Sequence, residues 1–448
     1  MPKKKNVREV ALDILTAVEK NQAYSNLSLN HAIKENDLSG KDVGLLTELT
    51  YGTIQHQLTL DYYVAPFLKN PKKIESWVLL LIKMSVFQMI YLDRVPERAA
   101  IHEAVEIAKK RAHRGVASLV NGVLRSIQRE GVPSLGEIKD PIQRISISTS
   151  HPVWLVEKWV EQFGLEETDK MCRENLQAPI QTGRVNLTKT NREDLIEKLT
   201  SEGFLVEPSL LIPEGIRCLK GNMALSDSFR EGLFSIQDES SMLVANALAP
   251  GEHDYILDSC AAPGGKTTHI GEKMNGKGKI MALDLHKHKT KLIEEQANRL
   301  SLSNINTKQM DARKAREFFE PNTFDKILVD APCSGLGVLK RKPDAKYTKK
   351  VEDLASLSKI QLNILEQVSS LVKDGGTIIY STCTVGKEEN DFVIDEFLQK
   401  HPEFEKDSQL VERMPEAVQP YIEGNRVQIL PQYFGSDGFF IASIRKKA

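Results

Sequence analysis

Apolar side chains recur at helical spacing through the first 130 residues of the chain. They stand at i, i+3, i+4, i+7 and i+8, the pattern of a helix with one buried face. Gly131 follows the last of these runs, a position typical of a helix end. The pattern predicts a helical bundle over residues 6–130. Its two clearest stripes are Val7, Val10, Ala11, Ile14, Leu15 and Val18, and then Trp77, Leu80, Leu81, Met84, Phe87 and Tyr91.

A short mixed region follows the bundle. Residues 151–176 have the spacing of two short helices, separated at Gly164. Gly183–Thr188 has the composition of a strand, and Asn191–Gly203 has that of a helix that Asn191 caps. These features predict a small unit of helices and strands in the middle of the chain.

From residue 254 onward, short apolar strands alternate with helical stretches. This alternation is typical of a doubly wound, mostly parallel sheet. Residues 427–447 hold two strand-like runs around a Gly-Ser-Asp-Gly turn, which predicts an antiparallel hairpin at the edge of the sheet. The predicted strands are Tyr255–Asp258, Lys279–Leu285, Ile305–Asp311, Asp325–Ala331 and Gly376–Thr382, and the predicted helices are 265–274, 287–300, 353–372 and 387–399.

Composition narrows the class of protein. A chain of 448 residues is too long for a single core, so we expect two or three domains. The most apolar run, Trp77–Leu92, contains Lys83 and is too short to cross a bilayer, and the basic N-terminus lacks the apolar segment of a secretory signal. The five cysteines include no Cys-x-x-Cys pair. Neither a metal site nor a disulfide framework is therefore indicated, and a reducing cytoplasm fits best.

The net charge of −1 excludes a uniformly basic protein, but the charge is unevenly spread. Residues 1–135 carry 19 Lys and Arg against 14 Asp and Glu. The segment Lys340–Lys350 carries six basic residues against Asp344 alone. Such a run by itself is most often a solvated loop. Its place beside the cleft described next suits the phosphate backbone of a nucleic acid.

The strongest local signal is Leu257–Ile270, LDSCAAPGGKTTHI, whose small residues lie between a predicted strand and a predicted helix. There the backbone can approach a ligand closely, and a helix N-terminus presents free N–H groups. The stretch has neither the dinucleotide-binding nor the full P-loop spacing. Asp284, Asp311 and Asp330 end the next three strands, at the edge where such sheets bind ligands. Asp284 is spaced to accept the ribose hydroxyls of an adenosine-type cofactor.

Two cysteines converge on the same edge of the predicted sheet. Cys333 lies in a loop that follows Asp330, and Cys383 ends the fifth strand, which is expected beside the fourth. Free cysteines are usually buried structural residues, and for either one alone that interpretation is favoured. A thiol in a strand-end loop can be partly exposed and activated, so a nucleophilic role stays open for the pair.

Three motifs carry a resemblance to a known family. DSCAAPGGKT (258–267), DAPCSGLG (330–337) with the basic stretch and KPD after it, and YSTCTVGKEEN (380–390) resemble in order and spacing the motifs of the RNA 5-methylcytosine methyltransferases, the Nol1/Nop2/Sun family. The likeness spans residues 232–446. The helical half, with LLTELTYGTIQHQLTLDYYV and LVNGVLRSI, is similar to the NusB-like RNA-binding domain of bacterial members. No motif position departs from the family, although the basic loop has more lysine than is usual there.

The resemblance implies three domains. Residues 1–135 would form an all-α NusB-like RNA-binding domain, and residues 136–231 a helical linker with a small α+β RNA-binding subdomain. Residues 232–448 would form a class I S-adenosylmethionine-dependent methyltransferase domain, a Rossmann-like α/β fold whose mostly parallel sheet has an antiparallel edge hairpin. We expect a monomeric cytoplasmic enzyme with S-adenosylmethionine as cofactor and with no metal or membrane partner. Its substrate would be a cytosine C5 in 16S small-subunit ribosomal RNA, free or within an assembly intermediate.

The same resemblance assigns roles to residues. Cys383 is expected to attack C6 of the cytosine, which makes C5 reactive toward the methyl group, and Cys333 is expected to assist release. Asp330 is expected to hydrogen-bond the edge of the base. The cofactor contacts carried over are Cys260, Ala261, Ala262, Pro263, Gly264, Gly265, Lys266, Asp284, Asp311 and Asp330, and the RNA contacts are Lys340, Arg341, Lys342 and Lys346.

Three other interpretations remain. The same chemistry could act on transfer RNA or another RNA. A methyltransferase of proteins or base nitrogens would keep the cofactor loop but has no use for Cys383, and it usually carries Asn/Asp-Pro-Pro-aromatic where this chain has Asp330-Ala-Pro-Cys. A non-catalytic RNA-binding adaptor of the NusB type would tolerate loss of both cysteines, and both are present.

Overall fold

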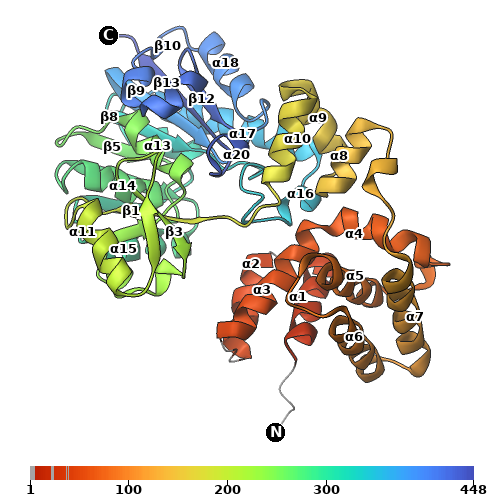
Figure 1. Ribbon diagram of the computed structural model, residues 1–448. Helices are drawn as coiled ribbons and strands as arrows, with labels where there is room; N and C mark the ends of the chain where they lie inside the picture. Colours follow the sequence, from red (N-terminus) through yellow and green to blue (C-terminus); the bar gives the residue numbers. More distant parts are fainter. Residues whose placement is uncertain (1–5, 22–24, 37, 39) are drawn as a thin grey trace. The chain divides into compact units, whose positions relative to one another are not determined.

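The computed structural model describes residues 6–21, 25–36, 38 and 40–448, so Lys3–Lys5 of the basic N-terminus lie outside the described residues. The chain divides into two compact units, which Figure 1 shows in the colours of the sequence. The helical unit comprises Met1–Gln177 and Leu339–Lys349, and the sheet unit comprises Ala178–Val338 and Lys350–Ala448. A short segment from the second half of the chain thus belongs to the helical unit.

The helical unit confirms the helices predicted over residues 6–130. Its elements are α1 (Val7–Asn21), α2 (Ser25–Glu35), α3 (Gly40–Gln55), α4 (Gln57–Val64), η1 (Ala65–Phe67), η2 (Pro71–Lys73), α5 (Ser76–Tyr91), α6 (Glu97–Arg111), α7 (Arg114–Glu130), η3 (Leu135–Glu137), α8 (Pro141–Thr149), α9 (Val153–Phe163), α10 (Leu165–Glu174) and α16 (Ala345–Thr348). Gly131 and Gly164 end α7 and α9 with φ angles of +76° and +79°, where a residue without Cβ is favoured.

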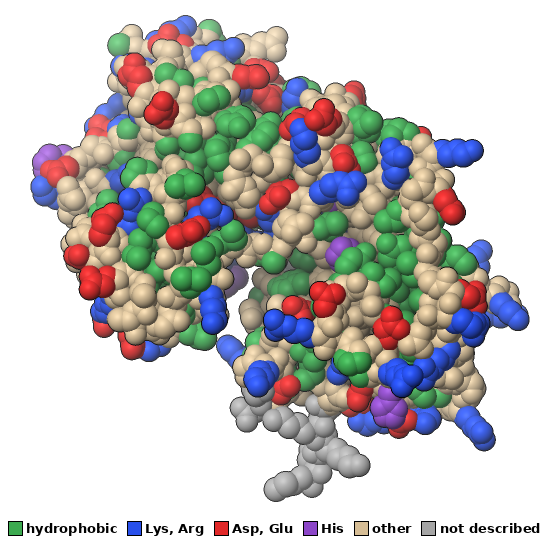
Figure 2. Space-filling model, viewed as in Figure 1, with side chains coloured by type: hydrophobic (Ala, Val, Ile, Leu, Met, Phe, Trp, Pro, Cys, Tyr) green, Lys and Arg blue, Asp and Glu red, His purple; other side chains and the backbone are tan. Residues whose placement is uncertain are grey.

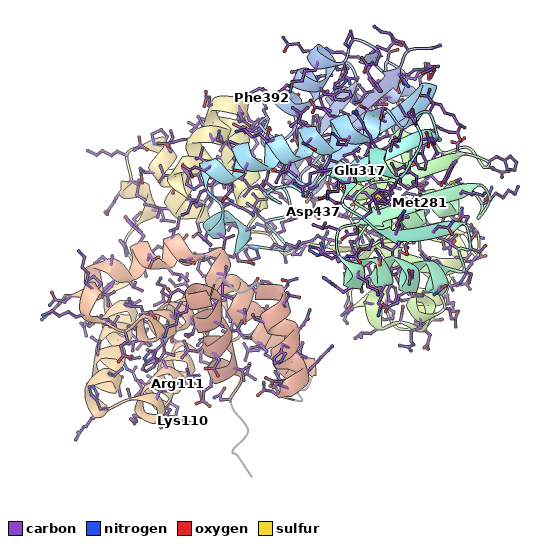
Figure 3. The ribbon with its side chains drawn as sticks, turned by 180° about the vertical axis from the view of Figure 1, so that it is seen from behind. Lys110, Arg111, Met281, Glu317, Phe392 and Asp437 are labelled. Atoms are coloured by element: carbon purple, nitrogen blue, oxygen red, sulfur yellow. The ribbon has the colours of Figure 1, made fainter. Side chains whose placement is uncertain are left out.

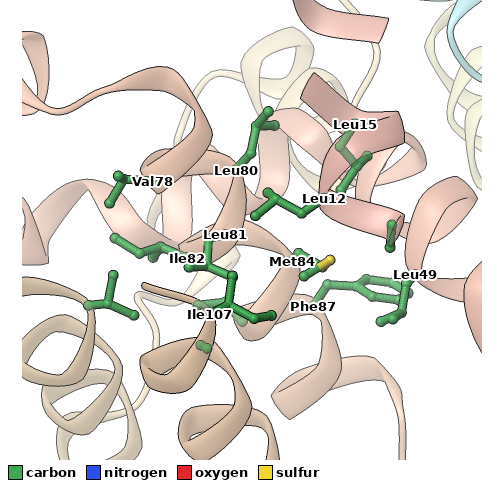
Figure 4. Packing of buried hydrophobic residues seen from close by; sticks show 14 of the residues in the cluster. Leu12, Leu15, Leu49, Val78, Leu80, Leu81, Ile82, Met84, Phe87 and Ile107 are labelled. Atoms are coloured by element: carbon green, nitrogen blue, oxygen red, sulfur yellow. The ribbon is translucent and has the colours of Figure 1, made fainter. Parts of the chain in front are cut away.

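The core of the helical unit is built around α5, which is apolar on nearly every side. A helix of this kind must be surrounded by other helices. Buried side chains of α5 between Val78 and Phe87 pack against Leu12 and Leu15 of α1, Leu49 of α3 and Ile107 of α6 (Figure 4). The apolar stripes of the sequence are therefore core.

The segment Leu339–Lys349 joins the helical unit because its side chains find partners there. The Lys346 side chain is buried, and its Nζ donates to the carbonyl oxygen of Gln55 at 2.9 Å. The Tyr347 ring packs on the core of the unit, and its hydroxyl donates to the carbonyl oxygen of Ser150 at 2.9 Å. This segment is thus held by contacts with residues far away in the sequence.

The sheet unit begins with a four-stranded antiparallel sheet in the order β2-β3-β1-β4. Its core contains Val185, Leu195 and Phe234. As predicted, Asn191 caps a helix, since its side chain accepts a hydrogen bond from the N–H of Asp194 at 2.9 Å. The elements are β1 (Gln181–Val185), α11 (Arg192–Ser201), β2 (Leu205–Pro208), β3 (Gly215–Lys220), η4 (Met223–Leu225), α12 (Asp227–Arg230) and β4 (Phe234–Ile236).

A larger sheet forms the rest of the sheet unit, in the order β11-β12-β13-β9-β8-β5-β6-β7, with β10 paired to β13. Strands β9, β8, β5, β6 and β7 are parallel, and the predicted hairpin joins them through antiparallel pairing of β13 with β9. The predicted doubly wound sheet is confirmed. Its strands are β5 (Tyr255–Asp258), β6 (Lys279–Asp284), β7 (Ile305–Gln309), β8 (Phe324–Asp330), β9 (Val372–Thr382), β10 (Phe404–Lys406), β11 (Ile422–Glu423), β12 (Arg426–Ile429) and β13 (Phe439–Lys446).

Helices cover both faces of this sheet. Ile327 and Ile378 pack toward α17 and α18, whereas the next residues, Leu328 and Ile379, pack toward α13 and α14. Because successive strand residues point to opposite faces, apolar runs bury both sides. The remaining elements are α13 (Glu239–Leu248), α14 (Gly265–Lys273), α15 (Lys287–Leu300), η5 (Ala312–Glu317), α17 (Val351–Ser369), α18 (Asp391–Lys400), α19 (Leu410–Arg413), η6 (Glu416–Tyr421) and α20 (Pro431–Phe434).

The compact units differ from the expected division of the chain. Helices α8 to α10 belong to the helical unit, where the Thr59 hydroxyl of α4 donates to the carbonyl oxygen of Ile147 at 2.6 Å. Strand β4 lies beyond residue 231 but pairs with β1. The helix predicted over 387–399 begins only at Asp391, because the backbone of Asn390 (φ −116°, ψ −94°) is not helical.

A buried ion pair joins β1 to α14. The Arg184 side chain is fully buried, and its Nε and Nη2 donate to the two carboxylate oxygens of Glu272 at 2.9 and 2.8 Å. Its Nη1 donates to the carbonyl oxygen of Gly265 at 2.8 Å, at the start of α14. The small sheet is thereby fixed to the first turn of that helix.

Arg184→Met should lower the free energy of unfolding of the sheet unit by about 3–5 kcal/mol, because Glu272 is left as an unpaired buried charge. Urea denaturation followed by circular dichroism measures the loss. Arg184→Met combined with Glu272→Leu should cost less than the single change, since no charge is then unpaired. A double variant less stable than the single one would contradict this account.

Candidate active site

Four parallel strands end at one edge of the larger sheet, and each brings a polar or reactive side chain there. β5 ends at Asp258, β6 at Asp284 and β8 at Asp330, while Cys383 directly follows β9. Figure 3 shows the sheet from behind, with Met281 marking β6. The carboxyl ends of parallel strands are where open α/β sheets bind ligands.

The turn between β5 and α14 contains the predicted cofactor loop, Cys260–Lys266. Gly264 has a φ angle of +106°, and a Cβ there would lie 3.1 Å from the Cα of Ile293. Glycine is needed for both reasons. The N–H of Ala261 donates to the carbonyl oxygen of Leu283 at 2.8 Å, which ties the loop to β6. The N-terminal N–H groups of α14 follow directly and lie at the same edge.

Asp258 is a residue of this edge that the sequence analysis missed. It is 1% exposed, its Oδ2 accepts a hydrogen bond from the Thr267 hydroxyl at 2.7 Å, and its Oδ1 has no partner of good geometry among the described residues. Burial raises the pKa of Asp258 to about 7, although the Thr267 hydrogen bond lowers it. An acidic residue directly before a glycine turn was the available signal. An orphaned carboxylate oxygen beside the loop fits a ligand that carries a positive charge, as S-adenosylmethionine does.

Asp284 and Asp311 differ in the partners that their carboxylates already bind. The Oδ1 of Asp284 accepts the N–H of His286 at 3.0 Å. The Arg313 guanidinium holds the Asp311 carboxylate at 2.7 Å and keeps the pKa of that carboxyl below its usual value. A cofactor contact through Asp311 would therefore have to displace a local ion pair, whereas Asp284 is the more available of the two.

A charged pair lies between the cofactor loop and β8. The Nζ of Lys266 donates to the Oδ2 of Asp330 at 2.7 Å, and the Ser381 hydroxyl donates to its Oδ1 at 2.8 Å. Burial disfavours the ammonium charge of Lys266, but the charges of Asp330 and Cys383 outweigh burial and raise the pKa of Lys266. Lys266 therefore stays protonated beside both residues.

The two predicted cysteines are brought together. The sulfur atoms of Cys333 and Cys383 lie 3.3 Å apart, and both residues are half-buried. The hydrogen bond to Cys383, together with burial, raises the pKa of Cys333 well above its usual value. A proton shared by the pair therefore resides on Cys333, and Cys383 is the sulfur that can carry negative charge.

Close backbone packing sets this distance. The N–H of Gly337 donates to the carbonyl oxygen of Cys383 at 3.0 Å. A Cβ on Gly337 would lie 2.0 Å from the carbonyl oxygen of Gly438 and 2.8 Å from that of Cys383. Any other residue at 337 would push the loop that carries Cys333 away from Cys383.

Cys260 lies in the cofactor loop but is not a third reactive thiol. Burial raises its pKa far above the usual value, and the nearby carboxylates of Asp258 and Asp330 add to this. A buried thiol with a raised pKa is a poor nucleophile. Its predicted contact with the cofactor would therefore not involve a thiolate.

The four predicted RNA contacts are unequal in exposure. Lys346 is fully buried with its pKa lowered by burial to about 7, and the 8% exposed Lys340 pairs its Nζ with Glu174 at 2.5 Å. Arg341 is half-buried and Lys342 is exposed. The amines of Lys340 and Lys346 are engaged within the helical unit and would have to leave these partners to contact RNA as predicted, so Arg341 and Lys342 are the more accessible of the four.

The basic excess of the helical region is partly neutralised within it. Lys110 and Arg111, labelled in Figure 3, pair with Glu9 at 2.8 Å and with Asp13 at 2.7 Å. Figure 2 shows acidic and basic side chains interspersed on the face in view. Part of the basic excess of residues 1–135 is therefore used in ion pairs within the helical unit.

Comparison with protein families covers most of the chain. A family described as 16S rRNA methyltransferase RsmB/F matches residues 245–445, and the NusB family matches residues 5–129. The ferredoxin-like domain of RsmF/B-like methyltransferases matches residues 151–224. The expected fold is confirmed: a NusB-like domain, a small α+β subdomain and a methyltransferase sheet.

Relatives match along the full length. The chain is 56% identical to the probable ribosomal RNA small subunit methyltransferase B of Bacillus subtilis, over 99% of this chain and 100% of that protein. It is 33% identical to ribosomal RNA small subunit methyltransferase B of Proteus mirabilis, over 99% of both. Among solved structures, PH0851 gives a TM-score of 0.81 at 27% identity over 99% of both chains. NSun6 from Pyrococcus horikoshii, solved with SFG, gives 0.58 at 25% identity over 65% of this chain and 97% of that one.

Neither a membrane-spanning helix nor a metal cluster occurs among the described residues. None of their helices is long and apolar enough to cross a membrane. Their side chains include no group of three or more His, Cys, Asp or Glu that could hold a metal ion.

Asp258→Asn should change how stability depends on pH. The folded protein holds the Asp258 proton up to about pH 7, whereas the ordinary pKa of an aspartate is 3.8, so wild-type stability falls as pH rises between these values. Asparagine cannot ionise and removes this loss. Denaturation at pH 5 and pH 8 should show the variant gaining about 2–3 kcal/mol relative to wild type. An equal difference at both pH values would contradict the raised pKa.

Proposed function

The chain belongs to the RsmB/F family of 16S ribosomal RNA methyltransferases, and from this premise we propose that it methylates C5 of a cytosine in small-subunit ribosomal RNA through a covalent adduct with Cys383. S-adenosylmethionine is the cofactor of this fold and supplies an electrophilic methyl group when bound. The observation that carries the proposal is the 3.3 Å between the sulfurs of Cys333 and Cys383. Methylation of a nitrogen or a protein side chain needs no such pair of thiols.

Cys383 makes C5 reactive. C5 of cytosine is a weak nucleophile until a nucleophile adds at C6. The Cys383 sulfur forms a bond to C6, and the electron pair of the C5–C6 double bond is then available at C5 for the methyl group. The nearby Lys266 ammonium favours the thiolate form of Cys383 by attraction between opposite charges.

Asp330 is the group that would hold the base. Its carboxylate lies at the end of β8, fixed by Lys266 at 2.7 Å and by the Ser381 hydroxyl at 2.8 Å. When Cys383 adds to C6, negative charge develops on the ring and N3 takes up a proton from solvent. A fixed carboxylate that accepts a hydrogen bond from that N3–H stabilises the adduct.

Cys333 is placed for the release step. After methylation, the C5 proton passes to water, the electron pair of the C5–H bond restores the C5–C6 double bond, and the bond from C6 to the Cys383 sulfur breaks. N3 returns its proton to solvent. The departing sulfur takes the bonding electrons. Cys333, 3.3 Å away with its proton retained, can donate a hydrogen bond to that sulfur as it leaves.

The substrate must present an unstacked cytosine, because the two thiols and Asp330 can reach C6 and N3 only outside a base stack. The proposal includes the roles expected for the other regions of the chain. The NusB-like region and the small subdomain hold the ribosomal RNA, Arg341 and Lys342 contact its phosphates, and the reaction takes place in the cytoplasm, where ribosomal RNA is assembled.

Cys383→Ala should lower methyl transfer to small-subunit ribosomal RNA by at least about 10³-fold, because the attacking sulfur is gone. Bisulfite mapping of 5-methylcytosine after reaction of the purified enzyme with unmodified RNA is the measurement. Cofactor affinity should stay within about twofold, since the loop is intact. Cys218→Ala, at a buried cysteine of the small sheet, is the control. Full activity of Cys383→Ala, or a methyl group at a position other than C5, would overturn the proposal.

Cys333→Ala should retain attack and methylation but slow release. A protein–RNA adduct that survives denaturing electrophoresis should then accumulate during turnover. Its formation should require Cys383, so Cys333→Ala combined with Cys383→Ala should show no slower band. Absence of an adduct in the single variant would count against the release role.

A further inference from the structure

Two adjacent side chains, Glu389 and Asn390, are buried near the cysteines but have no part in the mechanism above. Glu389 is 1% exposed and Asn390 is fully buried. They end the loop before α18, whose second residue, Phe392, is labelled in Figure 3. A buried carboxyl and a buried amide are costly unless hydrogen bonds compensate them, so their partners show what they hold.

Glu389 holds the residues on either side of Cys333. Its Oε2 accepts hydrogen bonds from the N–H of Ser334 at 2.8 Å and from the Nε2 of Gln361 at 2.9 Å. The same Nε2 of Gln361 donates to the carbonyl oxygen of Pro332 at 2.9 Å. The backbone groups before and after Cys333 are therefore fixed through one carboxylate oxygen.

Asn390 does the same for Cys383. Its Oδ1 accepts a hydrogen bond from the Thr382 hydroxyl at 2.5 Å, and its Nδ2 donates to the carbonyl oxygen of Thr384 at 3.2 Å. The residues before and after Cys383 thus both bind one amide group, whose donor and acceptor are both used.

A hydrogen bond joins the contacts around Cys333 to those around Cys383. The hydroxyl of Ser334, next to Cys333, lies 2.9 Å from the hydroxyl of Thr384, next to Cys383. The consecutive residues Glu389 and Asn390 therefore hold the neighbours of Cys333 and Cys383, which are 50 residues apart in the sequence. The sulfurs of these two cysteines lie 3.3 Å apart. A displacement of either flank changes the distance between the sulfurs directly.

The charge of Glu389 also acts on Cys333. Its charge contributes to raising the pKa of Cys333, and burial raises its own pKa. Its Oε1 has no hydrogen-bond partner among the described residues. An apolar residue at 389 would leave the N–H of Ser334 and the Nε2 of Gln361 without this acceptor, so the carboxyl is what ties both groups to one point.

We propose that Glu389 and Asn390 are positioning residues, one for each thiol: Glu389 sets the place of Cys333, and Asn390 sets the place of Cys383. This inference rests on the proposed function, in which Cys383 attacks and Cys333 assists release. Adjacent residues should therefore act on different steps of one reaction.

The first test separates the two steps with the full-length protein, small-subunit RNA and S-adenosylmethionine. Glu389→Ala should form the protein–RNA adduct at close to the wild-type rate but release it about 10–100-fold more slowly. Asn390→Ala should form the adduct about 10–100-fold more slowly, with release unchanged. Equal slowing of both steps in both variants would overturn the proposal, because it would indicate general loosening of the site.

A conservative variant tests the hydrogen bonds. Glu389→Gln keeps an oxygen that can accept from Ser334 and Gln361, so its release rate should lie within about threefold of wild type. A glutamine variant as slow as Glu389→Ala would overturn the positioning role in favour of a role for the charge.

A second readout requires no methyl transfer and stays informative if the proposed function fails. A diazenedicarboxamide oxidant can join Cys333 to Cys383: each thiol gives up its hydrogen, the two sulfurs form a disulfide, and the N=N bond is reduced to a hydrazine. Mass spectrometry of peptides follows the rate. Both alanine variants should form the disulfide about tenfold more slowly than wild type. Unchanged rates in both would overturn the proposal even if methylation proceeds as described.

Matched controls come from the same unit. Glu239→Ala and Asn425→Ala remove a buried carboxyl and a buried amide that are 4% and 1% exposed and bind Ser209 and Ser443. Both readouts should stay within about twofold, and an effect as large as that of the test variants would overturn the proposal. If Glu389→Ala does not fold, Gln361→Met removes the hydrogen bonds to Pro332 and to Glu389, leaves the one from Ser334 to Glu389, and should slow release. Normal release in Gln361→Met would overturn the role of Glu389.

Discussion

The edge of the larger sheet that carries Asp330, Cys333 and Cys383 depends on the parallel pairing of β8 with β9 in one register. Asp330 lies opposite Ser381, whose hydroxyl binds its carboxylate at 2.8 Å, and the N–H of Ala331 donates to the carbonyl oxygen of Ser381 at 2.9 Å. A slip of one residue would send the Asp330 side chain to the opposite face of the sheet. Because both strands end at the same level, the loops that follow them carry Cys333 and Cys383 to one place.

Burial then decides which groups near this place carry charge. Lys266 pairs with Asp330 at 2.7 Å, and this charge raises the pKa of Lys266 although burial lowers it. Asp258 has no cationic partner of its own, and burial raises its pKa to about 7. Cys333 keeps its proton because the hydrogen bond to Cys383, together with burial, raises its pKa. Distance and solvent exclusion thus favour the protonated forms of Lys266, Asp258 and Cys333.

The loop that carries Cys333 is restrained along its length. Ser334 is bound to Glu389, and Gly337 packs on the backbone of Cys383. A flexible catalytic loop would have to order itself at each turnover. Here the hydrogen bonds of Glu389 and Asn390 hold both thiols in place before any substrate binds, which is how preorganised sites gain rate.

The sequence by itself determined the elements and their order. Stripes of period 3.6 and alternating strands predicted the helical bundle and the doubly wound sheet, because that periodicity is a local property of the backbone. Motif order also brought Asp330, Cys333 and Cys383 to one edge, since carboxyl ends of parallel strands always meet there.

Only the tertiary structure decided which polar side chains are buried. Lys340 and Lys346 belong to a basic run, yet their partners Glu174 and Gln55 lie 166 and 291 residues away in the sequence. Glu389 and Asn390 have the composition of a solvated loop or an early helix turn, but their partners lie on other elements. Burial and hydrogen bonding between distant residues arise only when the chain has folded, so no local pattern could reveal them.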